Sequence, residues 1–519
     1  MRILFSVRNP TYVRHYDSVL RKLAERGHDV RLVMRPGTRS WPASVLTLAR
    51  ECPAIQLSTL PEAAFNHWWE LASRFRHSRL YLRFLKPEYR GTPGLLARAR
   101  ARAPRLAVHL GEWLGTHSAL RRMLVRVIDV LEQSTRSAAT FHQYLRDQQP
   151  DVVVMTPLVV LKTAQLDLAR AAMELGVRNV FAVASWDHLS SKTELTFSPQ
   201  RAFVWNEVQK EEVVQWHGVA ADDVIVTGSQ VFDEWFGRTP STTRADFCAR
   251  IGLRADRPIV LYVCSSLLEG SVPEAPFVVR WAQHLRASRH ALLRDSGILV
   301  RPHFRRRREW RDVNLGGLAN TACWPLEGEA PADAEAKADY FDSLYHADAI
   351  VGLNTSAMIE GAIVGRAVHT VLLPEFTESQ EGTIHFHYLL NDTHGVLHAT
   401  RSLDEHADDL AATLEGRGGD ADRSARFVRT FVRPSGLEIP ATARFVDELE
   451  QLVRQPPPAP VAVPPWTHLI RPVLWPFALA ASAKARQSRD AFRRQKRDLL
   501  IEHRRRKAAD RSTSARHKP

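Results

Sequence analysis

The segment 354–368 combines a polar helix start with a carboxylate one turn later, a spacing that suits binding of a phosphorylated nucleotide. It reads Asn-Thr-Ser-Ala-Met-Ile-Glu-Gly-Ala-Ile-Val-Gly-Arg-Ala-Val. Asn354, Thr355 or Ser356 can cap a helix whose first backbone amides then face an anion. Glu360 can accept hydrogen bonds from the hydroxyls of a ribose. An ordinary capped helix in an α/β core would show the same pattern.

A second group of candidate side chains follows the apolar run 297–300. The sequence there is Arg-Pro-His-Phe-Arg-Arg-Arg-Arg, residues 301–308. Cations at the carboxyl end of a strand can neutralise a departing diphosphate, whose developing charge is the main obstacle in transfer from a nucleotide-activated donor. We therefore expect Arg301, His303 and Arg305 to contact the donor. Residues 306–308 are explained as well by a solvated basic turn.

A candidate general base lies in the loop after the first apolar run. The loop reads Arg8-Asn9-Pro-Thr-Tyr-Val-Arg-His15. A neutral imidazole near physiological pH can take the proton of a hydroxyl group, so His15 is a candidate for this role. Arg8 and Asn9 are candidate acceptor contacts. A surface histidine at a helix start is the alternative.

The second acceptor-side candidate is Ser-Trp-Asp-His at 185–188. Asp187 can act as the base or can orient His188, and Trp186 offers an aromatic face to a sugar ring. An aspartate that caps a turn would explain the same residues.

Polar residues also follow the apolar run 367–373, and among them we expect Gln380 to contact hydroxyls of the donor. His385 and His387 are two residues apart, but no third metal ligand is near them in the sequence. No Asp-x-Asp motif and no glycine-rich phosphate loop occurs. We expect neither a metal nor a cofactor in the site.

The elements that position these residues form two α/β series. Continuous apolar runs, typical of parallel strands covered on both faces, alternate with helical patterns. They occur at 3–7, 30–34, 151–155, 179–184, 201–205 and 224–227, and again at 259–264, 297–301, 349–352 and 367–373. We predict an acceptor domain over 1–238, with an Arg-rich helical insertion at about 68–148, and a nucleotide-donor domain over 257–453. Residues 237–257 are interpreted as the connection between them.

Two doubly wound, Rossmann-like domains in sequence place a cleft where both sheets present their carboxyl edges. The length of 519 residues and a hydrophobic content of 45% suit two cores. Four scattered cysteines and the lack of a signal peptide or an 18-residue apolar span favour a cytoplasmic protein.

The net charge is concentrated at the end of the chain. Residues 454–519 are predicted to be a Pro-rich, extended linker and a basic tail. From Trp466 onward there are 15 Lys and Arg against four Asp and Glu, so this tail carries +11 of the net +14. Aromatic residues followed by a cationic helix suit peripheral attachment to an anionic membrane surface. A disordered tail is the alternative, and nucleic acid is not expected because no nucleic-acid motif accompanies the charge.

The series Thr-Ser-x-x-x-Glu-x-x-x-x-Gly-x-x-Val from Thr355 resembles the donor-nucleotide segment of GT-B glycosyltransferases. The order of elements over 1–453 is similar to relatives that build bacterial surface polymers, including the CDP-glycerol glycerophosphotransferases, and the Arg-Pro-His turn at Arg301 resembles theirs. The resemblance implies that Thr355 and Ser356 hold the donor phosphates, that Glu360 holds the ribose and that no metal is used. Leu353 and Asn354 replace a His-Gly pair that many sugar transferases carry.

These observations together predict a transferase that moves a sugar or a phospho-alditol unit to a hydroxyl acceptor. The donor is a nucleotide sugar or a CDP-alditol, and the acceptor is a polysaccharide or a lipid-linked molecule. Two alternatives remain open: a nucleotide-sugar epimerase of the same fold, and a non-catalytic scaffold attached to a membrane.

Overall fold

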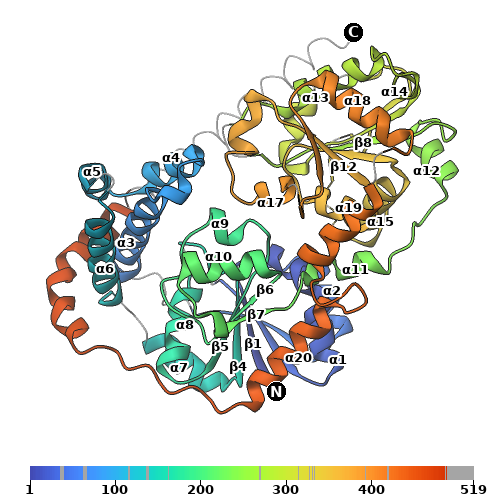
Figure 1. Ribbon diagram of the computed structural model, residues 1–519. Helices are drawn as coiled ribbons and strands as arrows, with labels where there is room; N and C mark the ends of the chain where they lie inside the picture. The colour runs from blue at the N-terminus through green and yellow to red at the C-terminus, as the bar shows by residue number, and fades with distance from the viewer. Residues whose placement is uncertain are drawn as a thin grey trace, which may run out of the picture.

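The computed structural model consists of two parallel-sheet α/β domains and a layer of helices beside the first (Figure 1). It describes residues 1–485 and 487, except 36–39, 62–66, 115–116, 136–138, 162, 268–270, 312, 314, 327, 330, 332, 392 and 418–419. The two doubly wound domains predicted from the apolar runs are confirmed.

The first sheet has seven parallel strands in the order β3-β2-β1-β4-β5-β6-β7. Its strands are β1 (Arg2–Val7), β2 (Asp29–Met34), β3 (Ile55–Thr59), β4 (Val152–Thr156), β5 (Arg178–Ala182), β6 (Arg201–Val204) and β7 (Val224–Val226). Helices α1 (Asp17–Glu25) and α2 (Ala43–Glu51) pack into one hydrophobic core and α7 (Ala139–Gln148) and α8 (Gln165–Glu174) into another. Strands with helices on both faces must be apolar throughout, which is why β4 has no exposed residue.

The second sheet has six parallel strands in the order β10-β9-β8-β11-β12-β13. Its strands are β8 (Ile259–Val263), β9 (Gly297–Arg301), β10 (Thr321–Cys323), β11 (Ala349–Val351), β12 (Ala367–Val371) and β13 (Leu397–Thr400). The helices that cover it are α12 (Arg244–Ile251), α13 (Glu274–Arg286), α14 (Ala291–Asp295), α15 (Ala334–His346), α16 (Ala357–Ile363), α18 (Leu403–Leu414) and α19 (Asp420–Phe427).

The expected connection at 237–257 is shorter in the structure. Thr243 caps α12 by accepting a hydrogen bond from the amide of Asp246, and Phe247 packs into the core of the second domain. The Pro- and Thr-containing start of the segment is the true link, and its second half already belongs to the domain that follows.

The last helix before the Pro-rich linker returns to the first domain. Helix α20 (Ala441–Arg454) packs beside α1, and Phe445, Val446 and Leu449 are buried in the same core as β1 and β2 (Figure 1). The sequence interpretation placed residues up to 453 in the donor domain, because an amphipathic helix does not show in its sequence which sheet it covers.

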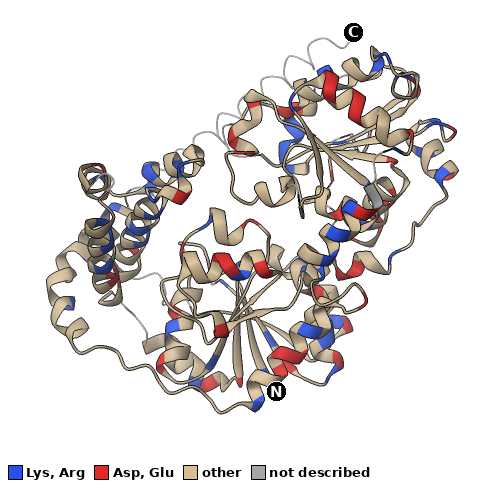
Figure 2. Ribbon diagram, in the orientation of Figure 1, with Lys and Arg blue, Asp and Glu red and all other residues tan. Residues whose placement is uncertain are grey.

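The Arg-rich segment forms helices α3 (His67–Phe84), α4 (Pro93–Arg102), α5 (Arg105–Leu114) and α6 (Ser118–Gln133), here called the helical layer. Buried charges fasten it to the first domain: the carboxylate of Glu132 accepts hydrogen bonds from Arg76 of α3 at 2.7 Å and from Arg170 of α8. Figure 2 shows the Lys and Arg of this layer, which number 13 against five Asp and Glu over 67–133.

The Pro-rich linker does not detach the tail from the body. The backbone amide of Val461 donates a hydrogen bond to the carbonyl of Met173, so the linker runs along the first domain. Residues 466–485 are helical, and Leu474, Ala478 and Ala481 pack against Trp68 and Leu71 of α3. The rest of the basic run, to Lys518, lies outside the described residues apart from Gln487. No described helix is long and apolar enough to cross a bilayer.

Candidate active site in the interdomain cleft

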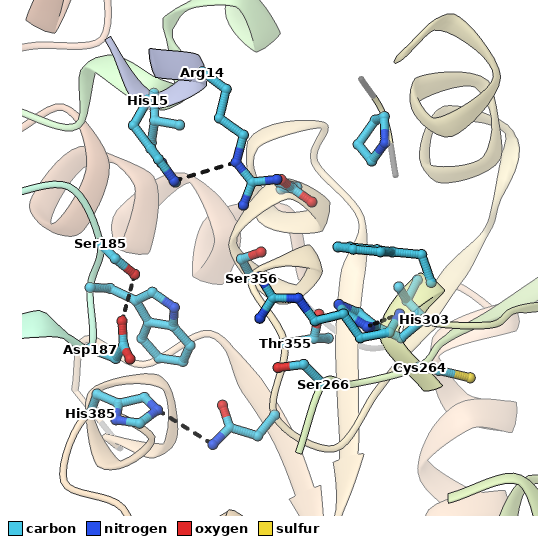
Figure 3. A pocket seen from close by; sticks show the side chains of 18 of the residues that line it. Arg14, His15, Ser185, Asp187, Cys264, Ser266, His303, Thr355, Ser356 and His385 are labelled. Carbon is cyan, nitrogen blue, oxygen red and sulfur yellow. Dashed lines mark hydrogen bonds between the residues drawn. The ribbon is translucent and has the colours of Figure 1, made fainter. Parts of the chain in front are cut away.

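A cavity of about 640 Å³ opens between the two domains (Figure 3). Its walls come from segments that follow the carboxyl ends of β1, β5, β8, β9 and β11. Of the predicted site residues, the cavity brings together His15, Trp186, Asp187, Arg301, His303, Arg305, Asn354, Thr355, Ser356 and Glu360. Loops at the carboxyl edge of parallel strands are where such sheets bind ligands, and here two edges face each other.

The wall of the cavity is cationic. Among the described residues that line it are seven Lys and Arg and four Asp and Glu. The cations are Arg14, Arg98, Lys192, Arg238, Arg301, Arg305 and Lys337. The three histidines of the wall add no charge at neutral pH. Burial, and after it the neighbouring cations, lower the pKa of His15 to about 3 and the pKa of His303 to about 4. Burial lowers the pKa of His385 to about 4. An excess of positive charge in a partly dry cavity suits a diphosphate.

The turn after β9 supplies the first cations. Arg301 is nearly buried, and its guanidinium donates to Asp339 at 2.8 Å and to Ser343 at 2.6 Å while it stacks over Tyr340. These partners hold one side of the guanidinium in place. His303 caps the following turn, since its Nδ1 accepts from the amide of Arg305 at 3.3 Å.

The start of α16 forms the facing wall. Ser356 is the residue before the helix and makes no side-chain cap bond, and the Oγ1 of Thr355 accepts only weakly, at 3.4 Å, from the amide of Ala357. Both hydroxyls therefore lie at the cavity without a strong hydrogen bond to the described part of the chain, so they can bind a ligand. Asn354 is different: its amide nitrogen donates to the carbonyl of Ser379 at 2.5 Å, so it fastens this turn to the next loop.

Glu360 lies one turn into α16 and faces Arg14 from the other domain. The hydroxyl of Tyr340 donates to its Oε2 at 2.5 Å. Burial raises the pKa of Glu360 to about 7, although Tyr340 and Arg14 oppose the rise. The carboxyl group is thus balanced between its two protonation states at neutral pH and changes its hydrogen-bonding capacity when the neighbouring charges change.

His15 ends the short helix η1 (Pro10–His15) that follows β1. The Nε of Arg14 donates to its Nε2 at 3.4 Å, a contact drawn in Figure 3, and its Nδ1 is buried with no partner in the described part of the chain. The neutral ring therefore carries its proton on Nδ1 and presents the lone pair of Nε2 toward Arg14 and the cavity.

Asp187 is held as a carboxylate. Ser185 donates to it at 2.6 Å and the ammonium of Lys192 lies 3.0 Å away (Figure 3). Burial alone would raise the pKa of Asp187, but Lys192, His188 and His385 outweigh it and hold that pKa well below its usual range. A carboxylate with these partners is a weak base, so Asp187 positions its neighbours better than it takes a proton.

Four predicted site residues do not line the cavity. The side chain of Asn9 caps η1 by accepting from the amide of Thr11, and Arg8 lies beside Tyr12. His188 is buried next to Tyr12 at the start of a short helix. Gln380 is also buried and donates to Leu353, Thr370 and Val371. Position after a strand does not reveal which way a side chain points.

The cavity also contains residues that the sequence prediction did not include. Arg14 precedes the predicted base, Tyr340 comes from α15 and His385 packs edge-on against Trp186 at 4.6 Å. Leu95 and Arg98 of α4 bring the helical layer to the rim. Arg14 and His385 lie in loops that were already singled out, so their polar character was the available signal. Nothing in the sequence around α4 indicates a place at the cleft.

The sequence matches no protein-family model, and no curated protein sequence is significantly similar to it. Solved structures are similar in fold. A putative UDP-N-acetylglucosamine 2-epimerase of Listeria monocytogenes has a TM-score of 0.51 and 10% identity over 89% of this chain and 99% of its own. A UDP-GlcNAc 2-epimerase of Neisseria meningitidis bound to UDP-GlcNAc has a TM-score of 0.50 and 12% identity over 87% of this chain and 100% of its own. A glycosyltransferase of Rickettsia africae ESF-5 has a TM-score of 0.49 and 10% identity over 88% of this chain and 99% of its own. With its two facing parallel-sheet domains, the chain has the GT-B fold.

Proposed function

We propose that the protein is a glycosyltransferase that moves a sugar or a phospho-alditol unit from a nucleotide-activated donor to a hydroxyl acceptor. One observation carries the proposal: Arg301, Thr355 and Glu360 from the second domain line the same cavity as His15 from the first. A diphosphate, a ribose and a candidate base thus each have a place in one site. The similarity to structures bound to UDP-GlcNAc supports a nucleotide sugar as the donor.

In the proposed reaction the acceptor oxygen attacks the transferred group and the bond to the diphosphate breaks. Arg301, Arg305 and the hydroxyls of Thr355 and Ser356 stabilise the negative charge that develops on the leaving group. Glu360 accepts hydrogen bonds from the ribose. His15 takes the acceptor proton on Nε2.

Arg14 connects donor binding to the base. In the empty cavity it donates to the Nε2 of His15, and its charge helps to keep the pKa of that ring low, after the effect of burial. A bound diphosphate attracts Arg14 and offsets its charge, so Nε2 becomes free and the imidazole becomes a stronger base. Donor binding would thereby remove one of the effects that lower the pKa of His15, while burial, the larger effect, remains.

Purified protein incubated with UDP-, CDP-, GDP- and TDP-sugars and CDP-glycerol, first alone and then with lipid-linked or oligosaccharide acceptors, tests the proposal. Transfer that requires an acceptor, and loses at least tenfold in rate in Arg301→Lys, supports it. Conversion of a nucleotide sugar to its epimer without acceptor would instead identify an epimerase, and the similar fold of epimerases gives this alternative its weight. Nucleotide binding without any turnover would favour a scaffold.

We further propose that an anionic membrane surface is a partner and that the helical layer joins the tail in binding it. Ten exposed large apolar side chains gather there, outside any core. They are Leu106, Trp113, Leu120, Met123 and Val127 on α5 and α6, and Leu469, Val473, Trp475, Phe477 and Leu479 on helix 466–485. Exposed Arg105, Arg122 and Arg126 accompany them, as basic residues do on interfacial helices.

The arrangement fits a lipid-linked acceptor, because the same layer reaches the cavity rim through Leu95 and Arg98. Sedimentation with phosphatidylglycerol vesicles tests the surface. Trp113→Ser with Met123→Ser should lower partitioning by about tenfold or more, since each buried apolar side chain contributes roughly 1.5–3 kcal/mol. Leu46→Ser, which replaces an exposed leucine on α2 away from the helical layer, is the control. If the double variant and the Leu46→Ser control partitioned equally onto the vesicles, the proposed membrane-binding surface would be wrong. Full binding after deletion of residues 486–519 would show that the cationic end of the chain is not part of that surface.

A further inference from the structure

Two histidines and an aspartate meet at the edge of the second sheet, away from the cleft. His369 of β12 and His398 of β13 are direct partners in the parallel register, and their rings stack with centroids 4.7 Å apart. Helix α18 covers this face and places Asp409 over both rings. One ligand atom from each of the three residues lies within 4.8 Å of the other two.

The two distances from the carboxylate to the imidazoles are close to those of a tetrahedral metal complex. Oδ2 of Asp409 lies 3.1 Å from Nδ1 of His369 and 3.6 Å from Nδ1 of His398. Zinc binds imidazole nitrogen and carboxylate oxygen at about 2.0–2.2 Å, which in a tetrahedron separates two ligand atoms by about 3.3–3.4 Å. Small movements of side chains would therefore admit the ion without a change in the backbone.

The surroundings supply what a metal site needs beyond its ligands. Oγ1 of Thr413 lies 3.2 Å from Nε2 of His369, so it can accept the proton on that nitrogen when Nδ1 binds a metal. The side chain of Asp409 is 33% exposed, which leaves a path for the ion and room for water as a fourth ligand.

A third imidazole lies beside the cluster. His406 is fully buried on α18, with its ring centroid 6.1 Å from that of His369, and neither of its nitrogens has a hydrogen-bond partner within the described residues. Two acceptor or donor atoms buried without partners are costly in an ordinary core.

We propose that His369, His398 and Asp409 bind a divalent transition-metal ion, for which zinc fits the imidazole and carboxylate ligands best. The ion clamps the edge strand β13 and helix α18 to β12. The next residue of β12, Thr370, accepts a hydrogen bond from Gln380, which holds the loop behind the cavity wall. The site is structural, and it is independent of the reaction proposed for the cleft.

Metal binding can be measured on the full chain, freed of any affinity tag and stripped with a chelator. Titration with Zn²⁺ in a calorimeter and with Co²⁺ by visible absorption should give one equivalent per chain, a tetrahedral Co²⁺ spectrum and a higher melting temperature. Asp409→Asn and His398→Asn should lower the affinity at least tenfold and abolish the spectrum. Asp408→Asn is the matched control, because Asp408 is the neighbouring residue on α18 but pairs with Arg289 and His290 instead.

Each outcome decides the proposal. Asp409 is partly exposed and asparagine keeps its shape, so that variant should fold, which circular dichroism checks. Binding below half an equivalent in the wild type, or equal binding by Asp409→Asn and wild type, would overturn the site. Loss of binding in Asp408→Asn to the same degree would also overturn it. Turnover of a nucleotide donor plays no part in these measurements, so failure of the cleft proposal would leave the result unchanged.

Discussion

Replacing Glu360 by glutamine should weaken binding of the donor in a manner that depends on pH. The side chain lies in the cavity, is held by the hydroxyl of Tyr340 and faces Arg14. Glutamine keeps its size but removes the charge and one acceptor oxygen. The effect on affinity therefore reports hydrogen bonds to the carboxylate rather than a change in packing.

The expected loss follows from the strength of such bonds. Hydrogen bonds to a charged group contribute about 1.5–3 kcal/mol, which corresponds to roughly 10- to 150-fold in Kd. Because burial raises the pKa of Glu360 to about 7, the wild-type group is mostly ionised at pH 8 and mostly protonated at pH 6. Ribose hydroxyls bind the ionised form better, so wild-type affinity should rise with pH through 7, whereas that of the variant should stay constant. The ratio of the two Kd values should shrink by about tenfold between pH 8 and pH 6.

Calorimetric titration with the best-bound nucleotide sugar, whose diphosphate does not titrate in this range, measures the ratio at each pH. Tyr340→Phe should move the midpoint of the wild-type curve upward, because Tyr340 lowers the pKa of Glu360. Glu375→Gln, which breaks only a surface pair with Arg280, is the control. A ratio near one at pH 8, or a ratio that does not change with pH, would refute the assignment of Glu360 to the ribose.

Three further predictions concern the base, the returning helix and the buried charges. His15→Ala should lower kcat by about 100-fold or more while the Kd of the donor changes little. If kcat and the affinity for the donor fell by the same factor, His15 would not be the base. Leu449→Ala should lower the free energy of unfolding of the first domain by about 2–5 kcal/mol in denaturant titration, because Leu449 is fully buried in that core. Stability should rise from pH 4.5 to 6.5, because in this window the buried histidines bind fewer protons in the folded than in the unfolded chain and outnumber the raised carboxyls, which bind more. It should fall from pH 6.5 toward 8, where only the raised carboxyls still bind more protons in the folded chain; melting temperatures across pH check both slopes. Burial lowers the pKa of His15 and His406 to about 3 and of His188, His303 and His385 to about 4, and it raises the pKa of Glu360 to about 7 and of Glu212 and Glu274 to about 8.

Most of the fold could be predicted because its central strands are buried on both faces and must be apolar. The strands that escaped prediction lie at or beside sheet edges, where this requirement is weaker. After Ile55, every residue of β3 is partly or fully exposed, and none of the three residues of β10 is buried. β13 has one buried residue, Leu397, of four. An edge strand of this kind has the composition of a loop.

The residues of the cavity could be predicted in part because each follows the carboxyl end of a strand. Arg301, Thr355 and Asp187 share that position, and the topology of parallel sheets brings such positions together. Gln380 has the same position but points into the core. The cluster of His369, His398 and Asp409 shows no ligand spacing, because its members are joined only by strand register and by the helix that covers them.

The two crossings of the chain between the domains meet at one carboxylate. Asp233 lies where the chain leaves the first domain, and Arg433 lies where it returns; their ion pair of 2.7 Å is more than nine-tenths buried on both sides. Asp233 also accepts from the amide of Thr442 at 2.6 Å and so caps α20. A buried pair loses far more when one partner moves than a surface pair does. The pair therefore ties the two crossings to each other and to the start of α20, so the loss of either partner should weaken the junction between the domains.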